Sequence, residues 1–285
     1  MGDDVAPVTV IGLGNLGLPI ATRLLRRGRD VVGCDLDTAR LAAFRETGGT
    51  AVRPEDLRPR PVACLVVPDD AAVESLLTAP DRLVSPGGLI VQHSTVSPEL
   101  ARRLAEDCRA QGYGYVDAPV SGGADRAADG TLAIMVGAAA EDQRRAEALL
   151  ADLGKEVIHL GGPGAGSAAK LANQLMLFAT LSGAYEAIEI AGRYGLAESA
   201  VLRAVGTGTG RSWVSDTWGF YDRLTRDYDA AGVPEAARPW AKDPAQAVAA
   251  AAAVGLDAPL AGLIAERLPG QVRRHADATG AEEST

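Results

Sequence analysis

The sequence predicts an α/β fold, in which a doubly wound parallel sheet is followed by an all-helical domain and a long helix joins the two. Short β-branched runs alternate with helical segments up to about residue 160, a pattern typical of a parallel sheet. The first run, residues 8–11, leads directly into a glycine-rich hexapeptide. Beyond Gly195 no segment has the pattern of a strand. We therefore expect a sheet domain over residues 1–162 and a helical domain over residues 163–285.

The bulk composition disfavours several classes of protein. The chain has 285 residues, enough for one large or two ordinary domains. Its formal net charge of -9 disfavours binding to nucleic acid or anionic membranes. Three cysteines without CxxC spacing suggest reduced thiols, and the three histidines show no metal-ligand spacing. The N-terminus lacks a signal-peptide pattern, and the apolar run 245–254 is too short to span a bilayer. We expect a cytoplasmic protein with no metal, no nucleic-acid partner and no membrane partner.

The glycine-rich hexapeptide predicts a dinucleotide site. It lies between the strand at 8–11 and a helix expected over 19–27, which is the context that the GxGxxG fingerprint requires. Glycines permit a tight turn and let the backbone approach a pyrophosphate, which then faces free N–H groups at the helix N-terminus. These features predict a Rossmann-type sheet. The expected cofactor-binding residues are Gly12, Leu13, Gly14, Asn15, Leu16 and Gly17.

Asp35 follows the next expected strand, at 31–34, and indicates which cofactor is used. In this fold an acidic residue at that place accepts hydrogen bonds from the adenosine ribose hydroxyls, and it would repel a 2′-phosphate. Asp37 adds a second negative charge, and no arginine stands immediately beside it in the sequence. The sequence therefore favours NAD over NADP. The alternative role for Asp35, capping the following helix, is compatible with Asp37 being the cap instead.

Two further strand–helix pairs continue the alternation. Strands are expected at 62–67 and 89–91, with one helix ending near residue 77 and another over 98–111 that has Ser97 at its N-cap. Ligands of such sheets bind outside the carboxyl ends of the strands. We therefore expect Val67, Pro68 and Thr95 to contact the cofactor.

The last strands of the sheet flank a second glycine segment. Strands are expected at 115–117, 131–136 and 156–160, and a helix at 141–153. After the first of these strands, Ser121, Gly122 and Gly123 present a hydroxyl and bare backbone N–H groups that could bind a carboxylate. Considered alone, the same segment would be a plain glycine-rich turn.

A long helix expected over residues 167–194 carries the candidate reactive group. Lys170 and Asn173 are three residues apart and therefore lie on one face of it. The chain has only three lysines among many arginines, and an amine, unlike a guanidinium, can give and take a proton. The alternative is a solvated lysine beside an amide bonded to water.

The remainder of the chain has the pattern of a helical domain. Helices are expected at 197–205, 213–221, 245–254 and 260–268, with loops at 206–211 and 232–239. Pro269 and Gly270 are expected to end the last helix. Residues 276–285 are polar and are expected to be frayed.

With these residues placed, the sequence resembles the β-hydroxyacid dehydrogenase family, which includes 3-hydroxyisobutyrate dehydrogenases and tartronate semialdehyde reductases. The resemblance covers nearly the whole chain in ordered blocks: GLGNLG from Gly12, HSTVSP from His93, DAPVSGG from Asp117, GAGSAAKLANQ from Gly164, GRSWVSD from Gly210 and KDPAQA from Lys242. The GRSWVSD block is closest to the 3-hydroxyisobutyrate dehydrogenases. The resemblance implies an NAD(P)-dependent oxidoreductase that interconverts a small β-hydroxy acid and its semialdehyde or keto form.

The resemblance also implies roles for single residues. Lys170 would take or give the hydroxyl proton, which requires a pKa below the usual value of about 10.4; burial or a nearby cation such as Lys242 would lower it. Asn173 would hold the substrate, Thr95 would contact the nicotinamide end, and Lys242 would contact cofactor or substrate. The substrate carboxylate would bind at Ser121, Gly122 and Gly123. Members of the family assemble through the helical domain, so a homodimer or tetramer is expected.

Four residues depart from the family pattern. Gln174 stands where a second Asn is frequent, and Gln92 replaces an Asp; Asp69 and Pro244 differ from the small hydroxyl residue and the KDL pattern that are usual. These departures leave the substrate open. An imine or biosynthetic carbonyl reductase is the alternative, although imine reductases commonly lack a lysine at the position of Lys170, and a non-catalytic dinucleotide-binding protein is the third. The helical domain is too short to resemble that of 6-phosphogluconate dehydrogenase, so no coupled decarboxylation is expected.

Overall fold

The structure is a computed structural model that describes residues 6–282. The chain forms two compact units, one ending at Lys170 and the other beginning at Leu171, and each is described separately. The predicted domain ranges, 1–162 and 163–285, reach beyond the described residues and stay a prediction.

The first unit is built on one mixed sheet that is mostly parallel. Within residues 6–282 it has nine strands, in the order β3-β2-β1-β4-β5-β6-β8-β7, and β9 pairs with β8. The pairs from β3 to β6 are parallel, whereas β8 runs antiparallel to β6 and β7. The prediction of a parallel sheet is therefore confirmed for the six strands β3, β2, β1, β4, β5 and β6. Beyond them the sheet is mixed. The strands are β1 (Val8–Ile11), β2 (Val31–Cys34), β3 (Thr50–Val52), β4 (Arg60–Leu65), β5 (Val84–Gln92), β6 (Gly114–Asp117), β7 (Val120–Ser121), β8 (Leu132–Ala138) and β9 (Gly154–Gly161).

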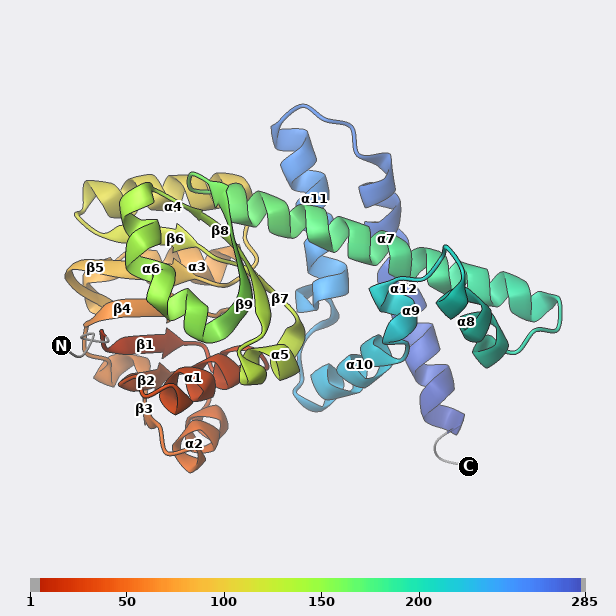
Figure 1. Ribbon diagram of the computed structural model, residues 1–285, viewed down its shortest axis with the longest axis horizontal. Helices are drawn as coiled ribbons and strands as arrows, with labels where there is room; N and C mark the ends of the chain where they lie inside the picture. The colour runs from red at the N-terminus through yellow and green to blue at the C-terminus, as the bar shows by residue number, and fades with distance from the viewer. Residues whose placement is uncertain (1–5, 283–285) are drawn as a thin grey trace. The chain divides into compact units, whose positions relative to one another are not determined.

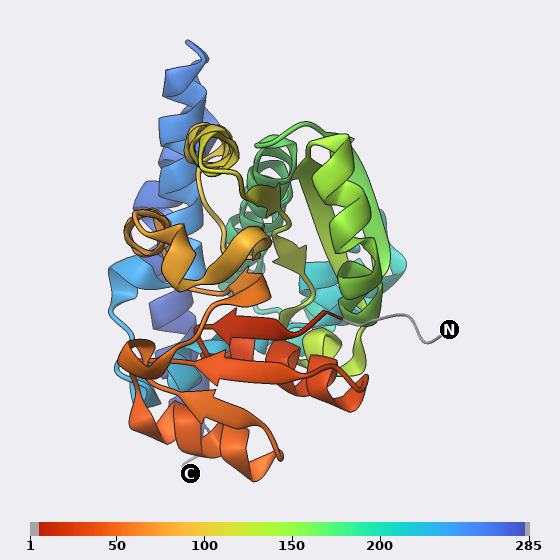
Figure 2. The same ribbon diagram turned by 90° about the vertical axis from the view of Figure 1, so that its left-hand side faces the viewer.

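Helices cover both faces of this sheet (Figure 1). Figure 2 shows α3 and α4 on the side of the sheet opposite α6. Two buried clusters result: one packs α1 and α6 against the sheet through residues such as Leu24 and Leu150, and the other packs α3 and α4 through Val73 and Leu104. The helices of this unit are α1 (Gly17–Arg26), α2 (Thr38–Glu46), α3 (Asp70–Leu77), α4 (Pro98–Ala110), α5 (Gly123–Asp129) and α6 (Ala140–Leu153), with short 3-10 turns at Pro54–Asp56 and Pro80–Arg82.

Local sequence explains these elements. All four residues of β1 are buried, as expected for a central parallel strand covered on both faces. In α4 the buried residues Leu100, Leu104 and Cys108 are four apart, so they share one face. Ser97 is the predicted N-cap, and its hydroxyl accepts a hydrogen bond from the N–H of Leu100 (3.3 Å).

Two predicted strands are displaced in the structure. The strand expected at 62–67 is β4, which ends at Leu65, because Val66 and Val67 leave the ladder to meet neighbouring segments. The strand expected at 89–91 is the longer β5, which starts at Val84 and passes Pro86 and two glycines through a shift in its register with β4.

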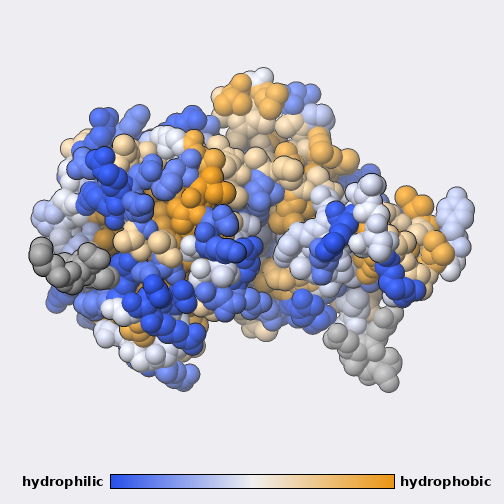
Figure 3. All heavy atoms as spheres, viewed as in Figure 1, coloured by the Kyte–Doolittle hydropathy of each residue, from blue (hydrophilic) through white to orange (hydrophobic). Residues whose placement is uncertain are grey.

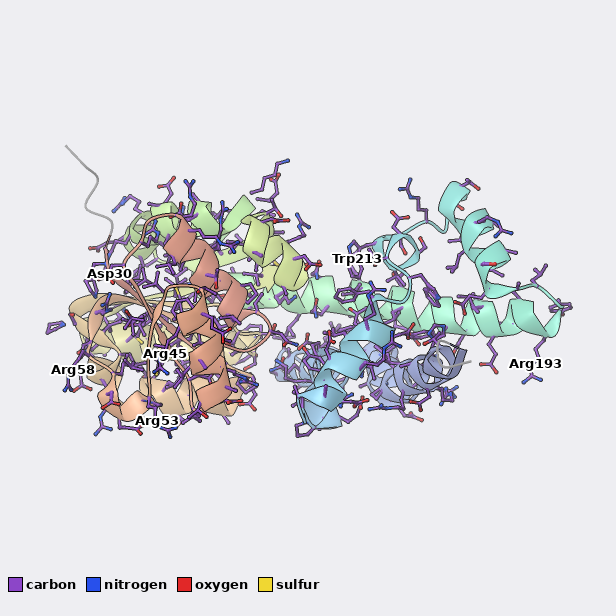
Figure 4. The ribbon with its side chains drawn as sticks, turned by 90° about the horizontal axis from the view of Figure 1, so that it is seen from below. Asp30, Arg45, Arg53, Arg58, Arg193 and Trp213 are labelled. Atoms are coloured by element: carbon purple, nitrogen blue, oxygen red, sulfur yellow. The ribbon has the colours of Figure 1, made fainter. Side chains whose placement is uncertain are left out.

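The second unit is helical, and no strand follows β9 among the described residues. Its core holds large buried side chains, including Phe178, Trp240 and Leu268. Trp213 on α9 is half exposed and packs edge-on against Phe220, with ring centroids 5.3 Å apart (Figure 4). The helices are α7 (Ala165–Arg193), which begins in the first unit, α8 (Glu198–Thr207), α9 (Trp213–Asp216), α10 (Phe220–Ala230), α11 (Pro239–Ala253) and α12 (Pro259–Glu282), with a 3-10 turn at Glu235–Ala237.

Helix α7 has a largely uncovered apolar surface. By length and composition alone it is the one described helix that could cross a membrane, a test that the core helix of a water-soluble protein also passes. Ile190 on α7 and Leu196 just beyond it are more than half exposed, as are Val254 and Leu256 near the α11–α12 connection. Figure 3 shows apolar residues gathered in both places.

Several predictions in the helical unit are wrong. The helix expected over 245–254 is α11, which begins at Pro239 and continues through Pro244. The helix expected over 213–221 is split, because Gly219 adopts a left-handed conformation (φ 80°) and starts α10. The expected break at Pro269 and Gly270 is absent, since α12 continues through both. Residues 276–282 are helical rather than frayed, while residues 283–285 lie outside the described residues.

Candidate active site

The glycine hexapeptide forms a turn that only glycine permits. Gly12 has φ 91°, and a Cβ on it would overlap the carbonyl oxygen of Val66. A Cβ on Gly17 would overlap the carbonyl oxygen of Gly12 itself. A Cβ on Gly14, in contrast, would meet only the Arg40 guanidinium, at 3.8 Å, so the backbone is open to a ligand there.

The end of this turn is suited to an anion. Leu16 occupies the N-cap of α1 and makes no side-chain cap hydrogen bond, and the first turn carries no acidic residue. A helix N-terminus of this kind presents N–H groups and the positive end of the helix dipole. The turn and the helix together fit the pyrophosphate of a dinucleotide.

Asp35 organises the same turn from the end of β2. It is buried, and one carboxylate oxygen accepts a hydrogen bond from the N–H of Leu13 (2.6 Å) while the other accepts from the N–H of Asp37 (2.8 Å). Asp37 caps α2 by accepting from the N–H of Ala39 (2.8 Å), so the capping role falls on Asp37 as the sequence suggested. Asp35 thus lies at the strand end where the adenosine ribose would bind, with its carboxylate held in place by two backbone N–H groups.

Arg40 is a residue of this site that the sequence analysis missed. It lies on α2, half exposed, with Nη1 3.7 Å from Oδ2 of Asp35 and Nε 3.7 Å from Oδ2 of Asp37. No arginine stands immediately beside Asp37 in the sequence, but Arg40, about one helical turn later, brings a positive charge close to both carboxylates. The spacing of Asp37 and Arg40, three residues apart on a capped helix, was the available signal.

The strand ends next to this turn are tied together. The N–H of Val67 donates to the hydroxyl of Ser94 (2.9 Å), which joins the segment after β4 to the segment after β5. Pro68 and Thr95 adjoin these two residues. Asp69 caps α3 by accepting from the N–H of Ala72 (2.9 Å), which gives its departure from the family pattern a structural role.

His93 connects the cofactor side of the first unit to the second glycine segment. Its Nδ1 lies 2.8 Å from the carbonyl oxygen of Ala118. Burial lowers the pKa of His93 to about 4, so the ring is neutral at physiological pH and Nδ1 can donate to that carbonyl.

The segment predicted to bind carboxylate has the backbone geometry of a glycine turn. Ser121 ends β7, and Gly122 and Gly123 have φ of 136° and 72°. A Cβ on Gly122 would come within 2.8 Å of Arg126. These glycines let the chain turn directly from β7 into α5.

Lys170 lies on α7 and is buried, whereas Lys155 on β9 is exposed. Asn173 follows it on the same helix and belongs to a polar chain in the second unit. The Asn173 amide donates to Oε1 of Gln174 (3.0 Å), and the Gln174 amide donates to Oδ2 of Asp243 (2.6 Å). Lys242 Nζ is 3.3 Å from Oδ1 of Asp243.

This polar chain gives two residues a role that the sequence did not. Asp243 is buried and joins α11 to α7, and its signal was its place in the KDPAQA block. Gln174, a departure from the family pattern, is the link that connects Asn173 with Asp243. Among the described residues, no group of three or more histidine, cysteine, aspartate or glutamate side chains is placed to hold a metal ion.

Comparisons with known proteins agree with this geometry. The family profile for the NAD binding domain of 6-phosphogluconate dehydrogenase matches residues 7–161, and that for the NAD-binding of NADP-dependent 3-hydroxyisobutyrate dehydrogenase matches residues 164–283. Human mitochondrial 3-hydroxyisobutyrate dehydrogenase is 32% identical over 217 residues, which span 74% of this chain and 65% of the human protein. The matched part is thus just under two thirds of that relative's length.

Two bacterial relatives extend the similarity. The 3-hydroxyisobutyrate dehydrogenase of Pseudomonas aeruginosa is 34% identical over 211 residues, covering 72% of this chain and 71% of that protein. The solved structure of Mycobacterium tuberculosis 3-hydroxyisobutyrate dehydrogenase with L-serine superimposes with a TM-score of 0.79 at 28% identity, over 96% of both chains. The dinucleotide turn, the fold of the two units and these matches together show that the chain belongs to the β-hydroxyacid dehydrogenase family.

Proposed function

We propose that the protein is an NAD(P)-dependent dehydrogenase that interconverts a small β-hydroxy acid and its semialdehyde or keto form. The observation that carries the proposal is the buried Lys170 on α7, in a unit whose glycine turn and Asp35 fit a dinucleotide. When bound, the nicotinamide accepts or supplies the hydride. The relatives named 3-hydroxyisobutyrate dehydrogenase support a substrate of this size and charge.

In this proposal Lys170 exchanges the proton of the reaction. During oxidation its amine takes the hydroxyl proton of the substrate, and during reduction its ammonium donates a proton to the carbonyl oxygen. A lysine suits this role because its amine can lose a proton where an arginine cannot.

The other predicted residues orient the reactants. Ser121, Gly122 and Gly123 bind the substrate carboxylate through a hydroxyl and backbone N–H groups. Asn173 holds the substrate, and its amide is steadied by Gln174. Lys242, beside Asp243, contacts cofactor or substrate. Val67 and Pro68 contact the cofactor, and Thr95 contacts its nicotinamide end.

We propose NAD as the preferred cofactor. The buried carboxylate of Asp35 would accept hydrogen bonds from ribose hydroxyls and would repel a 2′-phosphate. Arg40 acts in the opposite direction, because a guanidinium 3.7 Å from that carboxylate could bind a 2′-phosphate. The preference is therefore expected to be moderate, with measurable turnover of NADP.

We also propose a cytoplasmic homodimer or tetramer. All three cysteines are free and buried, which suits a reducing compartment. Apolar side chains are exposed on α7 and just beyond its C-terminal end, which favours burial of this surface against another subunit.

The test is production of NADH or NADPH by the purified protein with a panel of acids, each tried with NAD and with NADP. The panel contains 3-hydroxyisobutyrate, D-glycerate, 3-hydroxypropionate, 4-hydroxybutyrate and L-serine. Strong NAD-linked turnover of one acid is the expected result. No turnover of any acid in the panel, with NADH still bound, would contradict the proposal. Turnover of cyclic imines instead would identify an imine reductase.

A further inference from the structure

Asp117, the last residue of β6, supplies the cap of α7. It is fully buried. One carboxylate oxygen accepts a hydrogen bond from the N–H of Gly164 (2.8 Å), and the other accepts from the N–H of Ser167 (2.8 Å). These two N–H groups lie at the start of the helix, where the backbone has no intrahelical partner. A residue 47 to 50 positions earlier in the chain therefore does what a local N-cap residue usually does.

The first turn of α7 lies directly against the backbone of the sheet. A Cβ on Gly166 would overlap the carbonyl oxygen of Met135 and lie 2.7 Å from that of Asp117. A Cβ on Gly137, the β8 partner of Asp117, would lie 2.6 Å from Oδ1 of Asp117 and 2.7 Å from the N–H nitrogen of Gly166. Neither glycine can be replaced without moving the helix start or the strand. The start of α7 is therefore fixed in one position against the sheet.

The Asp117 carboxylate at this position accepts two directed hydrogen bonds, but its burial disfavours the charged form. Burial raises the pKa of Asp117, and the N–H groups of Gly164 and Ser167 act against that rise. Because the pKa in the folded state is raised, folding favours the protonated acid, and ionisation at neutral pH costs stability. What the carboxylate contributes at neutral pH is therefore the orientation of the helix start.

The same residue also begins the segment predicted to bind the substrate carboxylate. Ser121 follows Asp117 by four residues, along a path held by the bond from the N–H of Ala118 to the carbonyl oxygen of Gln92 (2.8 Å) and by that from the N–H of Met135 to the carbonyl oxygen of Pro119 (3.0 Å). On the other side, Lys170 follows Ser167 by three residues, a rise of about 4.5 Å along the helix. Both segments thus start at one buried carboxylate.

We propose that Asp117 is a positioning residue that holds Lys170 in register with the substrate-binding segment Ser121, Gly122 and Gly123. This inference rests on the proposed function, in which Lys170 exchanges the proton. A displacement of about 1 Å between reacting groups can lower a rate about 100-fold, so the position of the helix start bears directly on turnover.

The test compares D117N with a matched control, D152N. The D117N side chain keeps its shape and one acceptor oxygen but turns an NH2 group towards a backbone N–H. We expect kcat to fall by about 10- to 100-fold, the pH profile of kcat to shift, and the deuterium isotope effect on kcat to rise as hydride transfer becomes limiting. The KM for NAD should change less than about twofold, because the glycine turn is untouched.

Asp152 is a suitable control because it is a partly buried carboxylate of the same unit with a different task. It pairs with Arg29 (2.6 Å) and Arg27 (2.9 Å), away from the start of α7. D152N should lower the melting temperature and leave kcat, its pH profile and the isotope effect unchanged. A purely structural role for Asp117 would make D117N behave in the same way, and that result would overturn the proposal.

A second readout does not depend on activity. Amide hydrogen exchange over residues 164–170 should be faster in D117N than in the wild type and in D152N, because the helix start has lost its cap. Unchanged hydrogen exchange over residues 164–170 would also overturn the proposal. This readout works even if the wild type is inactive on every acid, because such inactivity would contradict only the proposed function. If D117N fails to fold by circular dichroism, D117S, which keeps a small hydroxyl acceptor, takes its place in both measurements.

Discussion

Lys170 is the residue on which the proposed chemistry depends. Replacing it with alanine should lower kcat by about 100- to 10,000-fold, the usual contribution of a positioned acid or base. NADH binding should be unchanged, because the dinucleotide turn lies elsewhere in the unit. Initial rates and NADH fluorescence titration measure the two effects separately.

Lys155 provides the matched control for this variant. It is exposed on β9, so K155A should retain wild-type turnover. Near-normal activity in folded K170A would remove Lys170 from the mechanism, whatever the substrate.

Arg40 should influence which cofactor is used. With R40A we expect kcat/KM for NADP to fall about tenfold, since a guanidinium–phosphate contact is lost, and kcat/KM for NAD to change by less than about threefold. Arg45, further along α2, donates to the carbonyl oxygen of Ala51 (2.7 Å), and R45A is the control; Figure 4 labels this residue. Equal losses with both cofactors in R40A would mean that Arg40 only supports the fold.

At the scale of elements, the dinucleotide turn can be tested with two glycines of similar backbone conformation. Gly12 and Gly28 have φ of 91° and 83°, but only Gly12 has neighbours that a Cβ would meet. G28A should lower the free energy of unfolding by about 1 kcal/mol. G12A should lose about 1–3 kcal/mol more through overlap with Val66, and should lose NADH binding.

Chemical denaturation and NADH fluorescence measure both effects. Similar losses of stability in the two variants, with binding kept in G12A, would show that the turn relaxes around a side chain. The cofactor site would then tolerate more change than its geometry indicates.

His275 joins three helices of the second unit. Its ring, on α12, lies 2.8 Å from Oδ1 of Asp222 on α10 and 3.1 Å from Oε2 of Glu198 on α8. Burial alone would lower the pKa of His275, but these two carboxylates outweigh it and raise the pKa above its ordinary value. His275, Asp222 and Glu198 line a surface cavity, and Arg223 and Arg226 line it as well.

The raised pKa predicts how stability depends on pH. The stabilisation from the charged ring is complete below the unfolded-state pKa of about 6.5 and is lost as pH rises through the higher folded-state pKa. The denaturant concentration at which the second unit is half unfolded should therefore decrease as the pH is raised above about 6.5. Tryptophan fluorescence reports it, since all three tryptophans (Trp213, Trp218 and Trp240) lie in that unit.

The matched variants are H275Q and H159Q. H275Q should flatten this pH dependence, whereas H159Q should not, because His159 is exposed on β9. An unchanged slope in H275Q would assign the pH dependence to other groups.

At the scale of the whole molecule, the uncovered apolar residues of α7 predict assembly. Met176 is 74% exposed and Ile190 61%, and exposed apolar surface that gathers on one element commonly marks an interface with another protein chain. Light scattering should give a mass of two or four times the chain's 29.3 kDa. A single-chain mass that persists across a concentration series would contradict the proposed oligomer.

Much of the fold could be predicted because its signals are local. The strands at 8–11 and 31–34 match β1 and β2 to the residue, since each is a short apolar run bounded by polar or turn-forming residues. The dinucleotide turn and the N-cap Ser97 were likewise readable, because glycine and capping residues act on their immediate neighbours.

Features that join distant segments could not be read in this way. The capping of α7 by Asp117 depends on which strand end lies beside the start of the helix, and no local pattern encodes that. Asp243 reaches Gln174 across 69 residues for the same reason.

In helix α12, tertiary packing outweighs the local preference of proline to end a helix. A proline inside a helix costs about 3 kcal/mol, so the sequence by itself predicts an end at Pro269. Ile264, Leu268 and Val272 lie on both sides of that proline and are buried in one core, and each contributes about 1.5–3 kcal/mol. The sequence alone determined the dinucleotide turn, the alternation of strands and helices and the candidate lysine, because these depend on near neighbours. The tertiary structure decided the cap of α7, the link from Gln174 to Asp243 and the course of α12, because burial and long-range hydrogen bonds there outweigh local preference.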